Sequence, residues 1–296
     1  MALVVFAVCM VSYSGPMVKG ALNEGASPIS VALLRMLAAA LLMLPYEARQ
    51  CVRRHIPMKL TPAQWGLTAL AAAFLAAHYI TWITSLTGTS TFASVALVCT
   101  QPLFVAFFSY VLFRERTPRR ALPGALLALL GAVTIALSGL SGQEAQATGQ
   151  EALRSNLLAL AGAVLMAAHW LAGRQIRQTL AAEVYTPVLY LITAALLALC
   201  LPLSGGFRMP LSALPYMAGL VIGSTLLGHA VFAYALSGVS ANVISFALLG
   251  EPVGAMIFSM IFFGEVPTWP VALGGLLTLM GLALYLAFAG GEKQPA

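Results

Sequence analysis

The sequence predicts an all-α membrane protein with ten transmembrane helices, arranged as two inverted five-helix repeats with both termini in the cytoplasm. Three observations lead to this prediction: a composition unlike that of soluble proteins, ten long apolar runs and an internal repeat. Of the 296 residues, 60% are hydrophobic and 8% are charged, whereas a soluble domain carries about 25% charged residues. The net charge of +6 does not indicate nucleic-acid binding, because the basic residues stand in short breaks between apolar runs.

Ten apolar segments are long enough to be membrane spans, since a helix needs about 20 apolar residues to cross the hydrocarbon core. Several begin at a Ser-Pro or Thr-Pro pair, such as Ser27-Pro28 or Thr61-Pro62, which is typical of a helix start. Their apolar character is continuous rather than alternating, which favours helices over strands. The segments are residues 2–22, 28–46, 64–86, 89–113, 118–139, 154–175, 184–204, 211–235, 240–263 and 267–289.

The basic residues predict the orientation of the chain in the membrane. With the N-terminus inside, 11 of the 15 Lys and Arg residues fall on the cytoplasmic side and 3 on the outside, while Arg35 lies within the second span. This bias follows the positive-inside rule. It predicts a multi-pass protein of the bacterial inner (cytoplasmic) membrane with both termini cytoplasmic.

The sequence lacks the cysteine and nucleotide-binding motifs that would predict a metal or a cofactor. The four cysteines lie far apart, without a CxxC or Cys/His ligand spacing. We therefore expect no disulfide and no metal site. The absence of a phosphate-binding loop motif also predicts that ATP is not the direct energy source.

An internal repeat divides the chain in two. At an offset of 150 residues, Gln101-Pro102 aligns with Glu251-Pro252 and Gly131 aligns with Gly281. Five helices per half is an odd number, so the second half must enter the membrane from the opposite side, an arrangement that recurs in transporters. We predict a first repeat at residues 1–140, an extracytoplasmic loop at 141–153 and a second repeat at 154–290.

The repeat motifs resemble a known family. Gly15-Pro16 followed by Leu34–Ala39, together with the Gln101-Pro102 and Glu251-Pro252 motifs, is similar to the EamA-like ten-helix members of the drug/metabolite transporter superfamily. The resemblance implies a central cavity lined mainly by helices 1, 3, 4, 6, 8 and 9, and export or exchange of small metabolites. One departure is Ser12-Tyr13-Ser14, where the family often has a tryptophan.

Ionisable groups inside a membrane cost about 2.5–3.5 kcal/mol each on insertion scales, so each is expected to have a partner or a function. Glu251 is the one acid well inside an apolar run, and Pro252 after it disturbs the helix. Glu251 can bind a substrate ammonium or carry a coupling proton; the alternative is that it accepts backbone N–H groups and locks two helices. For Arg35 we expect a structural role, capping carbonyls or pairing with a glutamate near a helix end, rather than a clamp on a substrate carboxylate.

Histidines and aromatic residues complete the predicted substrate site. Histidine changes charge most readily near neutral pH, although each membrane histidine is also suited to an ordinary helix–helix hydrogen bond. Aromatic rings can stack on a planar solute or hold an ammonium group. The predicted substrate-binding residues are Tyr13, Ser14, His78, Trp82, Gln101, His169, Trp170, His229, Tyr234 and Glu251.

These features predict a secondary transporter, not an enzyme. We expect an exporter or exchanger of a small amphipathic metabolite, such as an amino acid or amine, that works by alternating access with proton coupling at Glu251. The expected partners are the small-molecule substrate, the lipid bilayer and a second copy in a homodimer, without nucleic acid. Alternatives are a lipid-handling flippase or scaffold and an intramembrane enzyme; the last is disfavoured because the chain has no Asp and no HExxH or GxSxG motif.

Overall fold

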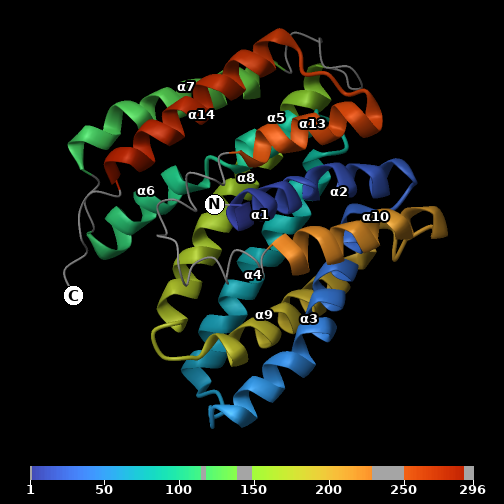
Figure 1. The fold of residues 1–296 in the computed structure, drawn as a ribbon, viewed down its shortest axis with the longest axis vertical. Helices are drawn as coiled ribbons and strands as arrows, with labels where there is room; N and C mark the ends of the chain where they lie inside the picture. Colours follow the sequence, from blue (N-terminus) through green and yellow to red (C-terminus); the bar gives the residue numbers. More distant parts are fainter. Residues whose placement is uncertain (1, 115–117, 139–148, 229–249, 290–296) are drawn as a thin grey trace.

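The computed structural model describes residues 2–114, 118–138, 149–228 and 250–289 (Figure 1). In this part of the chain the regular structure is helical, which confirms the predicted fold class. Seven helices are long and apolar enough to cross a membrane, and two shorter apolar helices lie at Leu211–Leu227 and Glu251–Phe263. The seven are Pro28–Arg53, Pro62–Ser85, Thr91–Phe113, Arg119–Ser138, Gly149–Ile176, Ala182–Leu199 and Trp269–Phe288.

The first predicted span is two helices rather than one. It consists of α1 (Ala2–Ser12) and α2 (Ser14–Asn23), with Tyr13 between them. Pro16 lacks the N–H group that would bond the carbonyl four residues earlier, so the helix is interrupted just before it.

Three spans of the first repeat begin at side-chain caps. The helix α3 (Pro28–Arg53) starts where the Ser27 side chain accepts a hydrogen bond from Ser30 N, and α4 (Pro62–Ser85) starts at a capping box of Thr61 and Gln64. Ser90 caps α5 (Thr91–Val98). The helix α3 extends beyond the predicted end at residue 46. The repeat continues with α6 (Gln101–Phe113), the 3₁₀ turn η1 (Arg119–Ala121) and α7 (Leu122–Ser138).

The second repeat begins with one long helix, α8 (Gly149–Ile176), which starts before its predicted first residue. The π-helical segment η5 (Gly219–Gly228) leads into residues 229–249, which lie outside the described part of the chain. The other elements are α9 (Ala182–Leu199), η3 (Leu201–Ser204), η4 (Leu211–Ala213), α10 (Leu214–Ala218), α13 (Glu251–Phe263) and α14 (Trp269–Ala289).

The predicted offset of 150 residues is visible in the backbone. The helices α6 and α13 are both 13 residues long, and each has proline at its second position. Each ends in a left-handed residue, at Arg114 with φ 59° and at Gly264 with φ 63°. Glycine adopts this conformation without steric cost, whereas arginine does so only rarely. The shared length and shared cap show that the two segments are the same structural unit.

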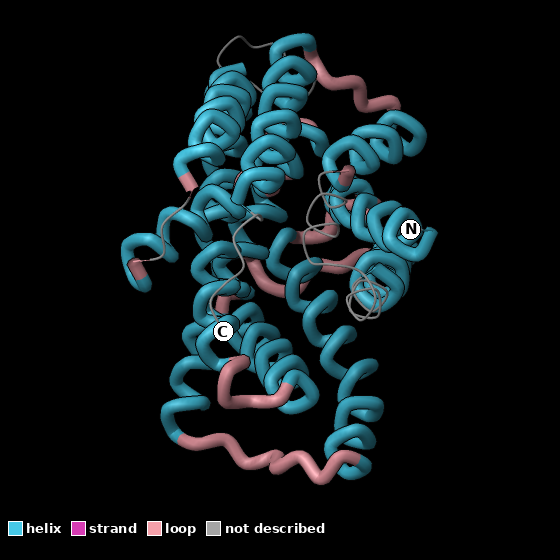
Figure 2. The backbone as a smooth tube through the Cα atoms, turned by 60° about the vertical axis from the view of Figure 1, so that its left-hand side comes forward, coloured by secondary structure: helices cyan, strands magenta, loops and turns pink. Residues whose placement is uncertain are grey.

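The helices of the two repeats pack in matching pairs. The pairs α7–α14 and α3–α9 each join equivalent helices, and they lie at opposite ends of the molecule in Figure 1. Between them α4 packs along α8, and its counterpart segments η5 and α10 pack on α1 and α2. Figure 2 shows the helices joined by loops, one of which is an extended connection at the bottom of the view. The structure therefore has the two-repeat architecture that the sequence predicts, while the cytoplasmic location of the termini stays a prediction.

Glycines set the close approach of α7 and α14. A Cβ atom added at Gly124 would meet the backbone of Tyr285, and one added at Gly131 would meet the backbone N of Thr278. Gly281 similarly faces the backbone of Ala128. Small residues let membrane helices approach in this way. The packing is internal to the chain, so this glycine face is used within one molecule.

Candidate functional site

Among the described residues two membrane spans are interrupted, each just before a proline, and α13 begins with the same Xaa-Pro pattern as the helix after the second interruption. Tyr13 separates α1 from α2 before Pro16, Cys99 and Thr100 separate α5 from α6 before Pro102, and α13 begins at Glu251 before Pro252. Backbone groups left without helical partners are tolerated at membrane depth only where protein buries them or where they line a water-filled cavity. The interruptions therefore mark the part of the bundle where a polar site is tolerated.

Arg35, the eighth of the 26 residues of α3, joins three elements near these interruptions. Its side chain is 4% exposed. Nη1 donates to Ser14 Oγ at 3.1 Å and Nε donates to Thr225 Oγ1 at 3.3 Å. Its Cζ atom lies 5.2 Å from the ring centroid of Tyr79 and 6.0 Å from that of Trp82, distances at which a cation is attracted to an aromatic face.

The partners of Arg35 differ from those expected from the sequence. Among the described residues it bonds two hydroxyl groups rather than helix carbonyls, and no carboxylate of these residues lies within ion-pair distance of it. The choice between a structural role and a substrate clamp stays a prediction, while the two hydroxyl partners were missed. The signal that was available is the cost of a lone arginine in an apolar run; its partners, 21 and 190 residues away, carry no local pattern.

His78 and Trp82, which lie on one face of α4, form a stack. Their ring centroids are 5.8 Å apart with an interplanar angle of 14°. His78 Nδ1 is 2.9 Å from the carbonyl of Gly162 on α8, so it makes an interhelical hydrogen bond. Trp82 is 6% exposed, and its Nε1 has no hydrogen-bond partner among the described residues. The structure thus brings Ser14, His78 and Trp82 together around Arg35.

Glu251 and Gln101 occupy equivalent positions, as the first residues of α13 and α6. The helix α13, which Glu251 begins, packs on α1 and on α2, and α2 carries the Ser14 hydroxyl that Arg35 bonds. The same helix packs on α5, which ends just before α6. The Oε1 atom of Gln101 is buried without a partner in the described part of the chain. Both residues therefore border the same region, from opposite repeats.

Tyr13 packs against α13. Its ring meets those of Phe258 and Phe262 edge to face, with centroids 5.2 and 5.6 Å apart. A Cβ atom on Gly254 would collide with the Ser12 side chain, so α1 approaches α13 closely at this point. Tyr13 thus belongs to the joint between the first helix of one repeat and the fourth helix of the other.

The remaining predicted site residues lie apart from Arg35 or outside the described residues. His169 Nδ1 is 2.9 Å from the carbonyl of Ala71, a second bond between α8 and α4. Trp170 is 52% exposed and has no ring contact or hydrogen bond with another described residue. His229 and Tyr234 fall in residues 229–249, outside the described part.

A network of polar contacts holds the loop between α4 and α5. Lys19 Nζ donates to the carbonyls of Leu86 at 2.6 Å and Thr89 at 3.3 Å. Thr89 Oγ1 donates to Asn156 Oδ1 at 2.7 Å, and Thr91 N donates to Glu265 Oε1 at 2.9 Å. We refer to Lys19, Thr89, Asn156 and Glu265 as the loop clamp. It joins α2, α8 and the end of α13 at the C-terminal end of α4.

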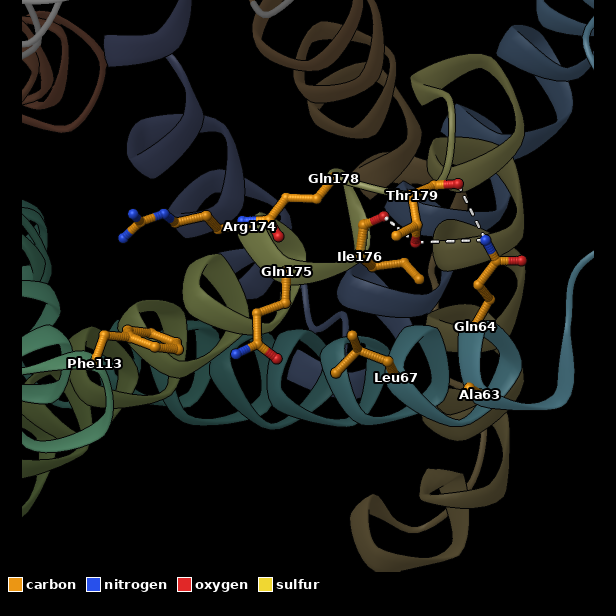
Figure 3. Close-up of a pocket in the computed structure, with 9 residues that line it drawn as sticks. All are labelled: Ala63, Gln64, Leu67, Phe113, Arg174, Gln175, Ile176, Gln178 and Thr179. Atoms are coloured by element: carbon orange, nitrogen blue, oxygen red, sulfur yellow. Dashed lines mark hydrogen bonds between the residues drawn. The ribbon is translucent and has the colours of Figure 1, made fainter. Parts of the chain in front are cut away.

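A pocket of about 530 Å³ lies at the other end of α4 (Figure 3). Because α4 has 24 residues and a helix rises 1.5 Å per residue, the two ends are about 36 Å apart. Gln64 Nε2 donates to the carbonyl of Thr179 at 3.1 Å on one side of the pocket, and Arg174 lies over the Phe113 ring on another. The pocket is lined by Ala63, Gln64, Leu67, Phe113, Arg174, Gln175, Ile176, Gln178 and Thr179.

Comparisons with known proteins give one family and one fold. The model of the EamA-like transporter family matches residues 1–137 and 153–287. A solved structure, described only as the crystal structure of a protein, is 19% identical over 98% of this chain and 98% of its own, with a TM-score of 0.65. At this identity the likeness shows a shared fold alone. No curated protein matches the sequence significantly.

Proposed function

Because this chain belongs to the EamA-like transporter family, we propose that it is a secondary transporter of a small amphipathic metabolite, such as an amino acid or amine. The family and the apolar helices already indicate a multi-pass membrane transporter of the drug/metabolite type. The substrate class, the outward direction, alternating access and proton coupling are the proposal. In this proposal the protein binds and moves a solute without converting it chemically.

The observation that carries this proposal is the placement of Glu251. Its carboxyl stands at the first residue of α13, a helix that packs on α1 and on α2, the helix whose Ser14 hydroxyl Arg35 bonds. A carboxylate at this depth costs free energy unless it is used or paired. It can bind the ammonium group of a substrate, and it can take up and release a proton. Both properties suit exchange of an amine for a proton.

Alternating access is supported by the difference between the two ends of α4. The loop clamp closes one end, whereas the other end carries the pocket of about 530 Å³. Inverted repeats open a central site to each face in turn when one repeat rocks against the other. We propose that the pocket is the cytoplasmic vestibule, because the basic residues near it follow the positive-inside rule. Export across the bacterial inner membrane by a homodimer completes the proposal. Mass measurement of the detergent-solubilised protein tests the oligomeric state.

Reconstitution into proteoliposomes tests the function. The vesicles are loaded with radiolabelled amino acids, amines and nucleosides, and efflux is followed with and without a pH gradient. We expect efflux of at least one amino acid or amine, accelerated by the gradient. Absence of flux for every amino acid and amine would refute the proposed function.

A matched pair of variants tests the role of Glu251. We expect Glu251→Gln to abolish acceleration by the gradient while solute exchange without a gradient continues. Glu24→Gln removes an exposed carboxylate and should leave both rates unchanged. Full acceleration in Glu251→Gln would show that another group carries the proton.

A further inference from the structure

The buried guanidinium of Arg35 has more donors than the described residues use. A guanidinium carries five N–H groups, and two of them donate to the hydroxyls of Ser14 and Thr225. Hydroxyl groups do not neutralise the charge. No carboxylate among the described residues lies within 4 Å of Arg35, and residues 229–249 contain no acid. Within the described part of the chain, three donors and a full positive charge are therefore left for an acceptor.

Trp82 supplies a further donor in the same cluster. Its ring lies 6.0 Å from Arg35 Cζ, and its buried Nε1 has no partner among the described residues. An indole N–H only donates, and leaving it unpaired costs about 1–3 kcal/mol. Two groups that only donate, in one buried cluster, call for a ligand that only accepts. An anion is such a ligand.

The charges nearby decide which anion fits. The other buried lysine or arginine among the described residues, Lys19, donates to the carbonyls of Leu86 and Thr89, so Arg35 is the cation that serves this cluster. One cation balances a carboxylate better than a doubly charged phosphate. Glu251 begins α13, which packs on α2, the helix whose Ser14 accepts from Arg35. A carboxylate on this side of the cluster favours a ligand that carries a positive group beside the negative one.

We propose that Arg35, together with Trp82 Nε1, forms a subsite that binds the carboxylate of a zwitterionic α-amino acid, whose ammonium group faces Glu251. Arg35 offers the planar pair of N–H donors that matches a carboxylate, and Ser14 and Thr225 fix its orientation. This inference rests on the proposed transport function and narrows its substrate class from amines in general to free amino acids.

Efflux from proteoliposomes tests the subsite. The vesicles contain an equimolar mixture of the common amino acids and the corresponding amino acid amides, which keep the ammonium group and lose the carboxylate charge. Mass spectrometry measures each efflux rate. The unaltered protein should export at least one amino acid tenfold or more faster than its amide.

Two pairs of variants assign this preference to residues. Arg35→Gln should lower efflux of the amino acid at least tenfold and leave its amide unchanged, whereas Arg54→Gln, at an exposed arginine, should change neither. Trp82→Phe keeps a ring and removes the N–H, so it should lower only the amino acid rate, by three- to tenfold. Trp65→Phe, at an exposed tryptophan, is its control.

The outcomes separate the two proposals. If the unaltered protein exports neither amino acids nor amides nor amines, the proposed function and this inference both fail. If it exports amino acids, but both variants reduce amino acid and amide rates equally or not at all, the inference alone fails. Should Arg35→Gln not yield a monodisperse protein, Trp82→Phe decides: a loss confined to the amino acids supports the subsite, and any other result overturns it.

Discussion

Replacing Lys19 with methionine should open the loop clamp. The variant keeps the volume of the side chain and removes two charge-assisted hydrogen bonds, to the carbonyls of Leu86 and Thr89. Each such bond is worth about 1.5–3 kcal/mol, and removing the buried ammonium returns about 2.5–3.5 kcal/mol. With both contributions at mid-range, the balance is a loss of about 1.5 kcal/mol from the clamped state, which shifts the population toward an opened state by about tenfold.

Cysteine labelling measures this shift. Thr91 has no exposed surface and lies at the start of α5, where its N–H is held by Glu265. In a background without the four native cysteines, Thr91→Cys reacts with a maleimide only when the clamp opens. When opening and closing are fast relative to labelling, the rate follows the open population. Lys19→Met should raise the labelling rate at least fivefold in the purified protein.

Lys59→Met is the matched control, because Lys59 is exposed in the loop before α4. It should leave the labelling rate within twofold of the background. If Lys19→Met labels at the background rate and its melting temperature is unchanged, the two hydrogen bonds do not hold the clamp. The reasoning that connects them to gating would then be wrong.

Three stability predictions follow from the packing, each checked by the melting temperature in detergent. Gly131→Ala should lower the melting temperature, because the new Cβ meets the Thr278 backbone. Its control, Gly66→Ala, adds a Cβ that meets nothing within 4 Å and should raise the melting temperature through better helix propensity. Equal shifts of the two variants would contradict the tight α7–α14 contact. Asn156→Ala should cost about 1–3 kcal/mol, since it removes the buried hydrogen bonds that the Asn156 amide makes with the Ile135 carbonyl and the Thr89 hydroxyl. Glu183→Gln breaks an ion pair whose arginine is 63% exposed, so it should cost less than about 1 kcal/mol; a larger loss would show that this pair is energetically coupled to its surroundings.

Features that depend on local sequence were predictable. Apolar runs of sufficient length and Ser-Pro or Thr-Pro starts located most helices, because these signals act within one or two turns. The Gln101-Pro102 and Glu251-Pro252 pairs revealed the repeat, and the structure places a new helix at both. The glycines of α7 and α14 likewise indicated close packing, since only a residue without a Cβ fits there.

Features that depend on distant partners were not predictable. Ser14 and Thr225 are two of many hydroxyl residues in the chain, and nothing in their neighbourhood marks them as ligands of Arg35. The interhelical bond of His78 to Gly162 joins a side chain to a carbonyl, which has no residue-type signal. Asn156 closes the loop clamp for the same reason. Such contacts appear only when the fold brings together segments separated by dozens of residues.

The two repeats share a backbone but divide the charge between them. Pro28 aligns with Pro187, an offset of 159 residues that pairs Arg35 with Ala194; Glu251 pairs with the neutral Gln101. The positive group thus comes only from the first repeat and the negative group only from the second. A zwitterion bound between Arg35 and Glu251 would bridge the repeats, and each charge would lose its partner if they moved apart. Binding would then favour states in which both repeats close around the solute, which is the coupling between occupancy and motion that alternating access requires.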